Sequence, residues 1–88
     1  MNETFACKLI SPEKVLFDGQ LWQLTAHDEF GSFSVRAKHQ DILAKLAHGN
    51  LEIAVSPEKR TTYKIKSGIL SMKKNTCLVT SDIFEPLS

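Results

Sequence analysis

The feature that most constrains this chain is an alternation of apolar and polar side chains with a period of two residues. Phe5, Cys7 and Leu9 fall on one face of a first segment, and residues 50–55 repeat the pattern. Successive strand residues point to opposite faces of a sheet, so this alternation is typical of strands with one buried face. In the later segment, the face predicted to be buried carries Leu51, Ile53 and Val55. Further short segments with strand composition cover residues 20–26, 32–36, 61–66, 69–72 and 76–80.

The segments between these strands carry the residues that favour turns. Pro, Gly, Asp and Asn supply the backbone conformations that tight turns need. Turns are predicted at residues 11–14, 18–19, 48–50, 56–59 and 73–75. Many short strands at this spacing indicate an all-β fold, a sandwich or a barrel.

Residues 40–48 do not follow the alternation. Asp41 could cap a helix, Gly49 could end it, and the residues between them are good helix formers. A run of about nine residues is marginal as an isolated helix, and packing overrides propensity readily. The residues alone therefore leave helix and strand open here.

Length and charge exclude several classes of protein. The chain has 88 residues, so it forms at most one compact domain, predicted over residues 1–88. Its formal charge of +1 supplies no overall field for nucleic acid or an acidic membrane. The sequence has no long apolar run, so we predict neither a membrane-spanning helix nor a secretory signal. Cys7 and Cys77 lie in strand-like segments, and we favour two reduced core thiols over a disulfide.

The sequence contains no recognisable catalytic or metal-binding motif. The histidines at 27, 39 and 48 lack the spacing that places two metal ligands on one face. The four glycines are isolated, so no phosphate-binding loop is predicted. We therefore predict no catalytic residue, metal, nucleotide or cofactor, and a binding or structural module. Trp22 shares a strand face with Leu24 and Ala26, so it is predicted to fill the core, with an interface anchor as the alternative.

A small nucleic-acid-binding β-barrel is the alternative function. Tyr63 would supply the aromatic platform on which a base stacks. The basic residues available beside it are Lys59, Arg60, Lys64, Lys66, Lys73 and Lys74. A lone aromatic among these cations equally fits an ordinary solvated sheet face.

The ordered set of segments resembles the amino-terminal β-domain of the epsilon subunit of F-type ATP synthases. The opening strand with its Ser-Pro-Glu turn, residues 5–13, is followed by segments that match in order over the whole chain. They are residues 15–19, 31–35 with His39, 42–46, 49–53, 63–70 and 76–82. The resemblance implies a flattened β-sandwich or barrel of about ten short strands in two sheets, with residues 40–48 as strand and connecting loop.

The resemblance also implies a function. An epsilon-like subunit is a non-catalytic rotor part of the central stalk, linking the gamma shaft to the membrane c ring during proton-driven ATP synthesis. The positions that match gamma contacts are Ser11, His39 and Ala44. Those that match the loop facing the c ring are Glu29, Phe30, Gly31 and Ser32, with Arg36 and Lys38 expected to flank it and pair with ring carboxylates. The implied location is peripheral, on the cytoplasmic face of the bacterial inner membrane.

The sequence departs from the family pattern at several positions. His39-Gln40-Asp41 stands where the family usually has a proline after its histidine and alanine, and Ser67-Gly68 replaces a double glycine. Family members commonly continue into a two-helix hairpin that inhibits ATP hydrolysis and in some members helps to bind ATP. The sequence ends at Ser88, so both of these functions are expected to be absent.

Overall fold

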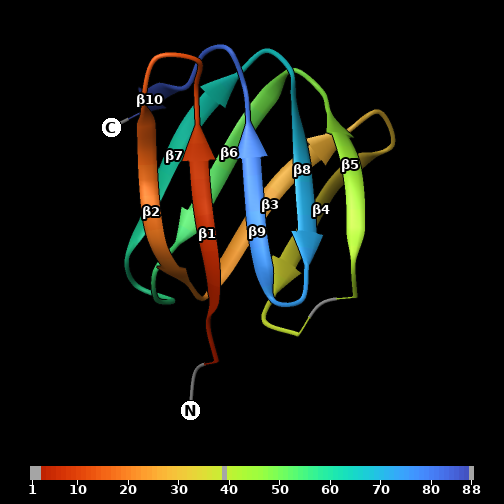
Figure 1. Ribbon diagram of the computed structural model, residues 1–88. Helices are drawn as coiled ribbons and strands as arrows, with labels where there is room; N and C mark the ends of the chain where they lie inside the picture. Colours follow the sequence, from red (N-terminus) through yellow and green to blue (C-terminus); the bar gives the residue numbers. More distant parts are fainter. Residues whose placement is uncertain (1–2, 39, 88) are drawn as a thin grey trace.

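The computed structural model describes residues 3–38 and 40–87, which form ten β-strands in two five-stranded sheets packed face to face (Figure 1). The first sheet has the order β2-β1-β9-β8-β5, and the second has the order β10-β7-β6-β3-β4. The strands of the first sheet are β1 (Phe5–Ile10), β2 (Val15–Leu21), β5 (Ile42–Leu46), β8 (Gly68–Lys73) and β9 (Thr76–Thr80). Those of the second are β3 (Gln23–Asp28), β4 (Gly31–Arg36), β6 (Gly49–Ala54), β7 (Arg60–Ile65) and β10 (Glu85–Leu87). This confirms the predicted all-β sandwich.

The core lies between the two sheets and is built from the alternation seen in the sequence. Phe5, Cys7 and Leu9 of β1 are at most 2% exposed, as predicted. β9 supplies Cys77 and Val79 in the same way. The remaining buried side chains of the cluster include Leu21, Leu24, Val35, Leu46, Leu51, Ile53, Ile65, Leu70 and Met72. Both cysteines are free thiols, which confirms the prediction for them.

Residues 42–46 are a strand, as the family resemblance implied, rather than the helix that their propensity allowed. β5 pairs antiparallel with β8 over its whole length, from Ile42 opposite Met72 to Leu46 opposite Gly68. The pairing satisfies the backbone and buries Leu46, which a short isolated helix could not do. Asp41 does not cap a helix, because its Oδ1 accepts a hydrogen bond from the backbone N–H of Lys74 at 3.0 Å.

Four local predictions were wrong. Residues 48–50 are not a turn, because Gly49 and Asn50 begin β6 and pair with β7. Residues 18–19 are not a turn, because Asp18 and Gly19 lie within β2 and pair with β1. Residues 20–26 are not one strand, because the chain bends at Trp22 between β2 and β3. Val55 is not buried as predicted but is 43% exposed, because β6 ends at Ala54. The backbone N–H of Val55 instead donates to the backbone carbonyl of Lys59 in the turn that leads to β7.

The predicted turns at residues 11–14, 56–59 and 73–75 are present. In the last of them, Lys74 and Asn75 both have positive φ, as a two-residue hairpin turn requires. Asn75 then joins three segments: its Oδ1 accepts from the backbone N–H of Lys38 at 2.7 Å, and its Nδ2 donates to the carbonyl of Thr4 at 3.2 Å. This turn therefore fixes the segment that leads from β4 to β5.

Candidate functional site

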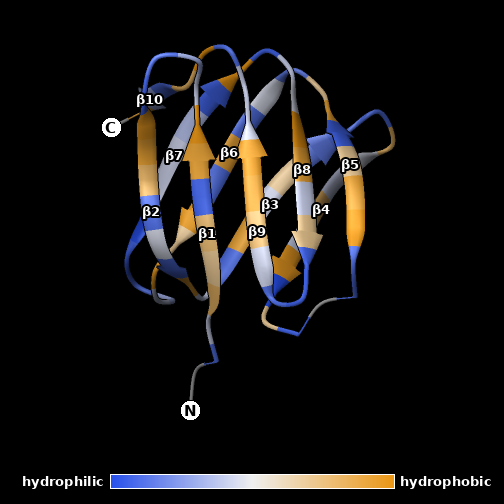
Figure 2. Cartoon of the chain, in the orientation of Figure 1, coloured by the Kyte–Doolittle hydropathy of each residue, from blue (hydrophilic) through white to orange (hydrophobic). Residues whose placement is uncertain are grey.

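The outer surface of the first sheet carries exposed apolar side chains from several strands. Leu43 of β5 is 77% exposed, Ile69 of β8 is 43% exposed and Leu78 of β9 is 39% exposed. Ser71 of β8 lies opposite both Leu43 and Leu78, so these side chains stand on the same side of the sheet. Val15, at the start of β2, is 52% exposed. We call Val15, Leu43, Ile69 and Leu78 the outer apolar face, and Figure 2 shows hydrophobic colour along β5, β8 and β9.

The outer apolar face has few charges within it. Lys8 lies opposite Leu78, and its Nζ approaches the Asp18 carboxylate at 3.9 Å. Lys45 lies opposite Ile69 at the edge strand β5. Water-exposed apolar side chains that gather on neighbouring strands and are rimmed by polar ones mark interaction sites more often than isolated ones do. The surface is therefore suited to bind a partner protein rather than to carry out chemistry.

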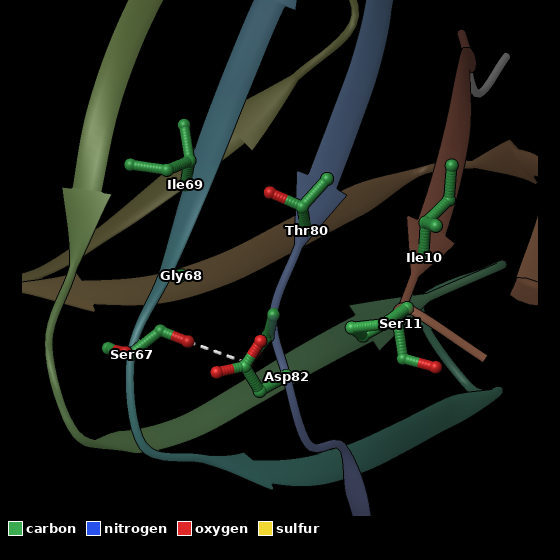
Figure 3. A pocket seen from close by; sticks show the side chains of 9 residues that line it. Ile10, Ser11, Ser67, Gly68, Ile69, Thr80 and Asp82 are labelled. Atoms are coloured by element: carbon green, nitrogen blue, oxygen red, sulfur yellow. Dashed lines mark hydrogen bonds between the residues drawn. The ribbon is translucent and has the colours of Figure 1, made fainter. Parts of the chain in front are cut away.

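Ser11 lies at the end of this face, on the rim of a hollow of about 380 Å³ (Figure 3). Its hydroxyl and backbone N–H bond Lys14 within the turn that joins β1 to β2. Ser81 also lines the hollow, and its buried hydroxyl donates to the backbone carbonyl of Ser67 at 2.6 Å. The residues that line the hollow are Ile10, Ser11, Pro12, Ser67, Gly68, Ile69, Thr80, Ser81 and Asp82. Ile69 thus belongs both to the hollow and to the outer apolar face.

A second hollow, of about 480 Å³, joins two groups of residues that the family resemblance assigned to different partners. Ala44 lines it from β5, and Glu29 and Phe30 line it from the loop between β3 and β4. The side chain of Phe30 is 89% exposed. The backbone N–H of Phe30 donates a hydrogen bond to Asp28 Oδ1 at 2.8 Å, which fixes the conformation of the loop. Gly31 has φ +130°, which a residue with a side chain adopts only with strain. The loop therefore presents an aromatic ring to solvent in a defined conformation.

Arg36 and Lys38 do not lie beside this loop. The loop precedes Gly31 at one end of β4, and Arg36 is the last residue of the strand. Five residue steps at roughly 3.3–3.4 Å each separate them by about 17 Å. Figure 1 shows the loop between β3 and β4 at the upper end of the sandwich and the end of β4 at the lower end. The six residues expected to face the c ring therefore form two separate groups.

The two cations at the lower end each have a partner within the domain. The Nε of Arg36 donates to Gln23 Oε1 at 2.6 Å, and its guanidinium lies 4.0 Å from the ring centroid of Trp22. The ammonium group of Lys38 lies 2.8 Å from the Glu3 carboxylate. This contact lowers the pKa of Glu3 and raises the pKa of Lys38.

Trp22 does not fill the core, contrary to prediction. Leu24 and Ala26 are buried, but Trp22 sits at the bend before β3 and stays half-buried. Its backbone N–H bonds the Ala54 carbonyl, and its ring has a second guanidinium, that of Arg60, at 5.7 Å. The bend breaks the strand alternation from which the core position was inferred.

The structure removes the basis for a nucleic-acid-binding face. Tyr63 packs against the core, with its ring edge-to-face with Phe84 at a centroid distance of 6.0 Å, so it is no open stacking platform. Arg60 is paired with Glu52 at 2.8 Å. Lys73 and Lys74 belong to the end of the first sheet and its following turn, whereas Lys64 belongs to the second sheet. The predicted basic set is thus dispersed over two sheets.

Two of the three residues expected to contact gamma lie within the described ranges. Ser11 and Ala44 both lie in the first sheet or its connections, in different hollows, and His39 lies outside the described residues. The outer apolar face was missed by the sequence reasoning. The sequence does carry one signal for this exposed surface, the pairs of adjacent apolar residues Ile69-Leu70 and Leu78-Val79. Neighbouring strand residues point to opposite faces, so one member of each pair must point away from the core.

Neither metal-binding clusters nor membrane-spanning helices occur in the described ranges. Within residues 3–38 and 40–87, no group of three or more His, Cys, Asp or Glu side chains converges as metal ligands would. Over the same ranges, no helix has the length and apolar character needed to cross a bilayer.

Comparison with known proteins gives the class of the fold. The family model described as "ATP synthase, Delta/Epsilon chain, beta-sandwich domain" matches residues 4–87. A chain of the Euglena gracilis mitochondrial ATP synthase superposes with a TM-score of 0.88 at 19% identity, covering 94% of this chain and 53% of that one. A chain of the Tetrahymena thermophila mitochondrial ATP synthase central stalk and c ring gives a TM-score of 0.77 at 20% identity, covering 94% and 66%.

Related sequences agree with this class. The ATP synthase epsilon chain of Leptospira borgpetersenii is 34% identical over 89% of this chain and 64% of its own length. That of Clostridium novyi is 25% identical over 97% and 65%, and that of Chlorobium limicola is 24% identical over 93% and 94%. The chain thus spans about two thirds of the first two relatives and most of the third. It belongs to the delta/epsilon family of ATP synthase subunits.

Proposed function

We propose that this chain is a non-catalytic central-stalk subunit that links the gamma shaft to the c ring of an F-type ATP synthase. The observation that carries the proposal is the outer apolar face, which is exposed in a domain of the delta/epsilon family. Burying such a surface is favourable, at roughly 25 cal/mol per Å² of apolar area. The proposed occupant is the gamma subunit, with Ser11 at the margin of the contact. Ala44 points to the opposite side of β5 from Leu43, so it and His39 remain gamma contacts that only the family resemblance implies.

The proposed task is mechanical. A rotor part must transmit torque without deforming, and close-packed interiors have low compressibility. The two sheets share one continuous core and the described chain has no second domain that could move against it. A stable contact with gamma needs about 1,000 Å² of total buried surface or more, with an apolar centre and a polar rim. The outer apolar face would supply the centre, and Lys8, Lys45 and Ser11 the rim.

The loop between β3 and β4 is the proposed contact to the c ring. Glu29, Phe30, Gly31 and Ser32 are all exposed, and the loop projects from the edge of the sandwich beside β5 (Figure 1). Phe30 would bury its aromatic side chain against the polar loops of the c ring. Glu29 would pair with a cation or a backbone N–H of those loops. Since Arg36 and Lys38 lie at the other end of β4, we assign the proposed contact with the c ring to residues 29–32 alone.

The proposed setting is the cytoplasmic face of a bacterial inner membrane, in proton-driven ATP synthesis. The bacterial relatives support this setting. The domain would act there as a peripheral protein with no bound nucleotide, metal or cofactor, and without inserting into the membrane. All the contacts proposed are made by the β-sandwich.

The test is complex formation with the gamma subunit of the same organism. Co-elution in size-exclusion chromatography is expected for the unaltered chain and is expected to be lost for Ile69→Lys. Val55→Lys is the matched control, because Val55 is also 43% exposed but lies in the turn after β6. Equal binding by both variants would remove the outer apolar face from the proposal. Failure of the unaltered chain to bind gamma would overturn the proposed function itself.

A further inference from the structure

The two cysteines of the chain face one another across neighbouring strands. Cys7 of β1 and Cys77 of β9 are directly in register, in the one parallel pair found among the described strands. Both side chains point into the core and are 2% and 1% exposed. Neighbouring strands lie about 4.7–4.9 Å apart, which is within the Cα separations of about 4.4–6.8 Å that disulfides span. The backbone therefore holds the two residues at a separation that a disulfide can bridge.

The two thiols also interact with each other. The hydrogen bond between them, together with burial, raises the pKa of Cys7. The same hydrogen bond lowers the pKa of Cys77. The contact thus favours the ionised form of Cys77, and the thiolate is the form that reacts with oxidants.

We propose that Cys7 and Cys77 form an intramolecular disulfide when the folded protein meets hydrogen peroxide. The Cys77 thiolate attacks one peroxide oxygen and breaks the O–O bond, giving a sulfenic acid and hydroxide, which takes up the proton that Cys77 released. The Cys7 sulfur then attacks the sulfenic sulfur, and its proton leaves with the departing hydroxyl as water. In sum, two thiols lose two electrons and two protons, and one peroxide becomes two water molecules.

Two features favour this outcome over oxidation to higher acids. Peroxide is small, so brief opening of the sheet admits it to a buried pair, and the second cysteine lies directly opposite the first on the neighbouring strand. The sequence holds no third cysteine that could capture the sulfenic acid within the chain. The bond would tie the amino-terminal strand to β9 and close a loop of most of the chain, which restricts the unfolded state. It leaves the outer apolar face unchanged and does not depend on the proposed function.

The experiment treats the native protein with hydrogen peroxide, then unfolds it and labels remaining thiols with N-ethylmaleimide before measuring the intact mass. The expected product has lost the mass of two hydrogen atoms and takes up no maleimide. Digestion without reductant should yield one cross-linked peptide pair that contains Cys7 and Cys77, from monomeric protein. The oxidised chain should also unfold at a higher urea concentration than the reduced chain.

Cys7→Ala and Cys77→Ala are the matched controls. Each should lose the two-hydrogen product, and Cys7→Ala should accumulate sulfenic or sulfinic acid at Cys77. The reaction is repeated at a urea concentration just below the unfolding transition, where opening is more frequent. The proposal is overturned if both thiols still take up maleimide in both conditions, if the cross-link joins two chains, or if oxidation lowers the unfolding midpoint.

Discussion

Gly68 packs directly against the backbone of Thr80: a Cβ at position 68 would stand 2.5 Å from the Thr80 carbonyl oxygen. The contact lies in the hollow beside Ser11, where β8 starts next to the end of β9 (Figure 3). The blocking atom is backbone held in a sheet, so it cannot move aside as a flexible side chain could. The family resemblance marks this position by a glycine, and the structure supplies the steric reason.

Gly68→Ala should therefore destabilise the domain. Forcing a methyl group into a packed site typically costs about 1–3 kcal/mol. Urea unfolding followed by circular dichroism measures the change. Ser67→Ala is the control, because the Ser67 side chain is exposed and only its backbone carbonyl accepts from Ser81, so it should shift stability by no more than about 0.5 kcal/mol. Equal effects of the two substitutions would contradict the steric explanation.

Arg36→Met should disturb the environment of Trp22. The guanidinium of Arg36 lies 4.0 Å from the Trp22 ring centroid, and such exposed contacts are worth about 0.5–1 kcal/mol. Trp22 is the only tryptophan of the sequence, so its fluorescence emission reports the change directly. Lys64→Met, also in the second sheet, is the control and should leave the emission unaltered. An unchanged spectrum in Arg36→Met would mean that the stacking is not maintained in solution.

The ion pair between Glu3 and Lys38 should contribute to stability only between its two titrations. The Lys38 ammonium lowers the Glu3 pKa from its ordinary 4.5, so this contribution is complete above pH 4.5 and is lost as the pH falls through the lowered value. The raised Lys38 pKa means that the contribution is complete below pH 10.5 and is lost as the pH rises through the raised value. In an NMR titration, Lys38→Met should return the Glu3 pKa towards 4.5. A Glu3 pKa that stays low in the variant would refute the pairing.

Glu29→Lys combined with Phe30→Ala should weaken attachment to the c ring while the domain stays folded. Both side chains are exposed in the loop before β4, so their removal costs the core nothing. The measurement is ATP-driven proton pumping by membranes reconstituted with the variant subunit, alongside a circular dichroism spectrum. Arg36→Ala, at the other end of β4, is the comparison and should retain coupling. If the loop variant couples normally, the loop has no part in the ring contact.

Features of the fold and the site that depend on residues close together in the sequence could be predicted, whereas those that depend on distant segments could not. Phe5, Cys7 and Leu9 could be assigned to the core because their alternation is local to one strand. The adjacent pair Ile69-Leu70 indicates that one of its members leaves the core, but which member is exposed could not be assigned. The exposure of Ile69 and Leu43 depends on which strands flank β8 and on what covers the sheet's outer side. Arg36 follows the loop by only a few residues in sequence, but the extended strand carries it to the opposite end of the sandwich.

By itself, the sequence determined that this chain forms short strands with one buried face, joined by turns that Pro, Gly and Asn make easy. These properties arise from neighbouring residues, through side-chain alternation and backbone sterics. For residues 42–46 the local preferences left helix and strand open; the family resemblance implied a strand, and pairing with β8 explains it. Only the tertiary structure decided that Trp22 leaves the core and that Cys7 meets Cys77. Each of these depends on pairing between segments distant in sequence, whose hydrogen bonds and packing outweigh the local preferences of the residues.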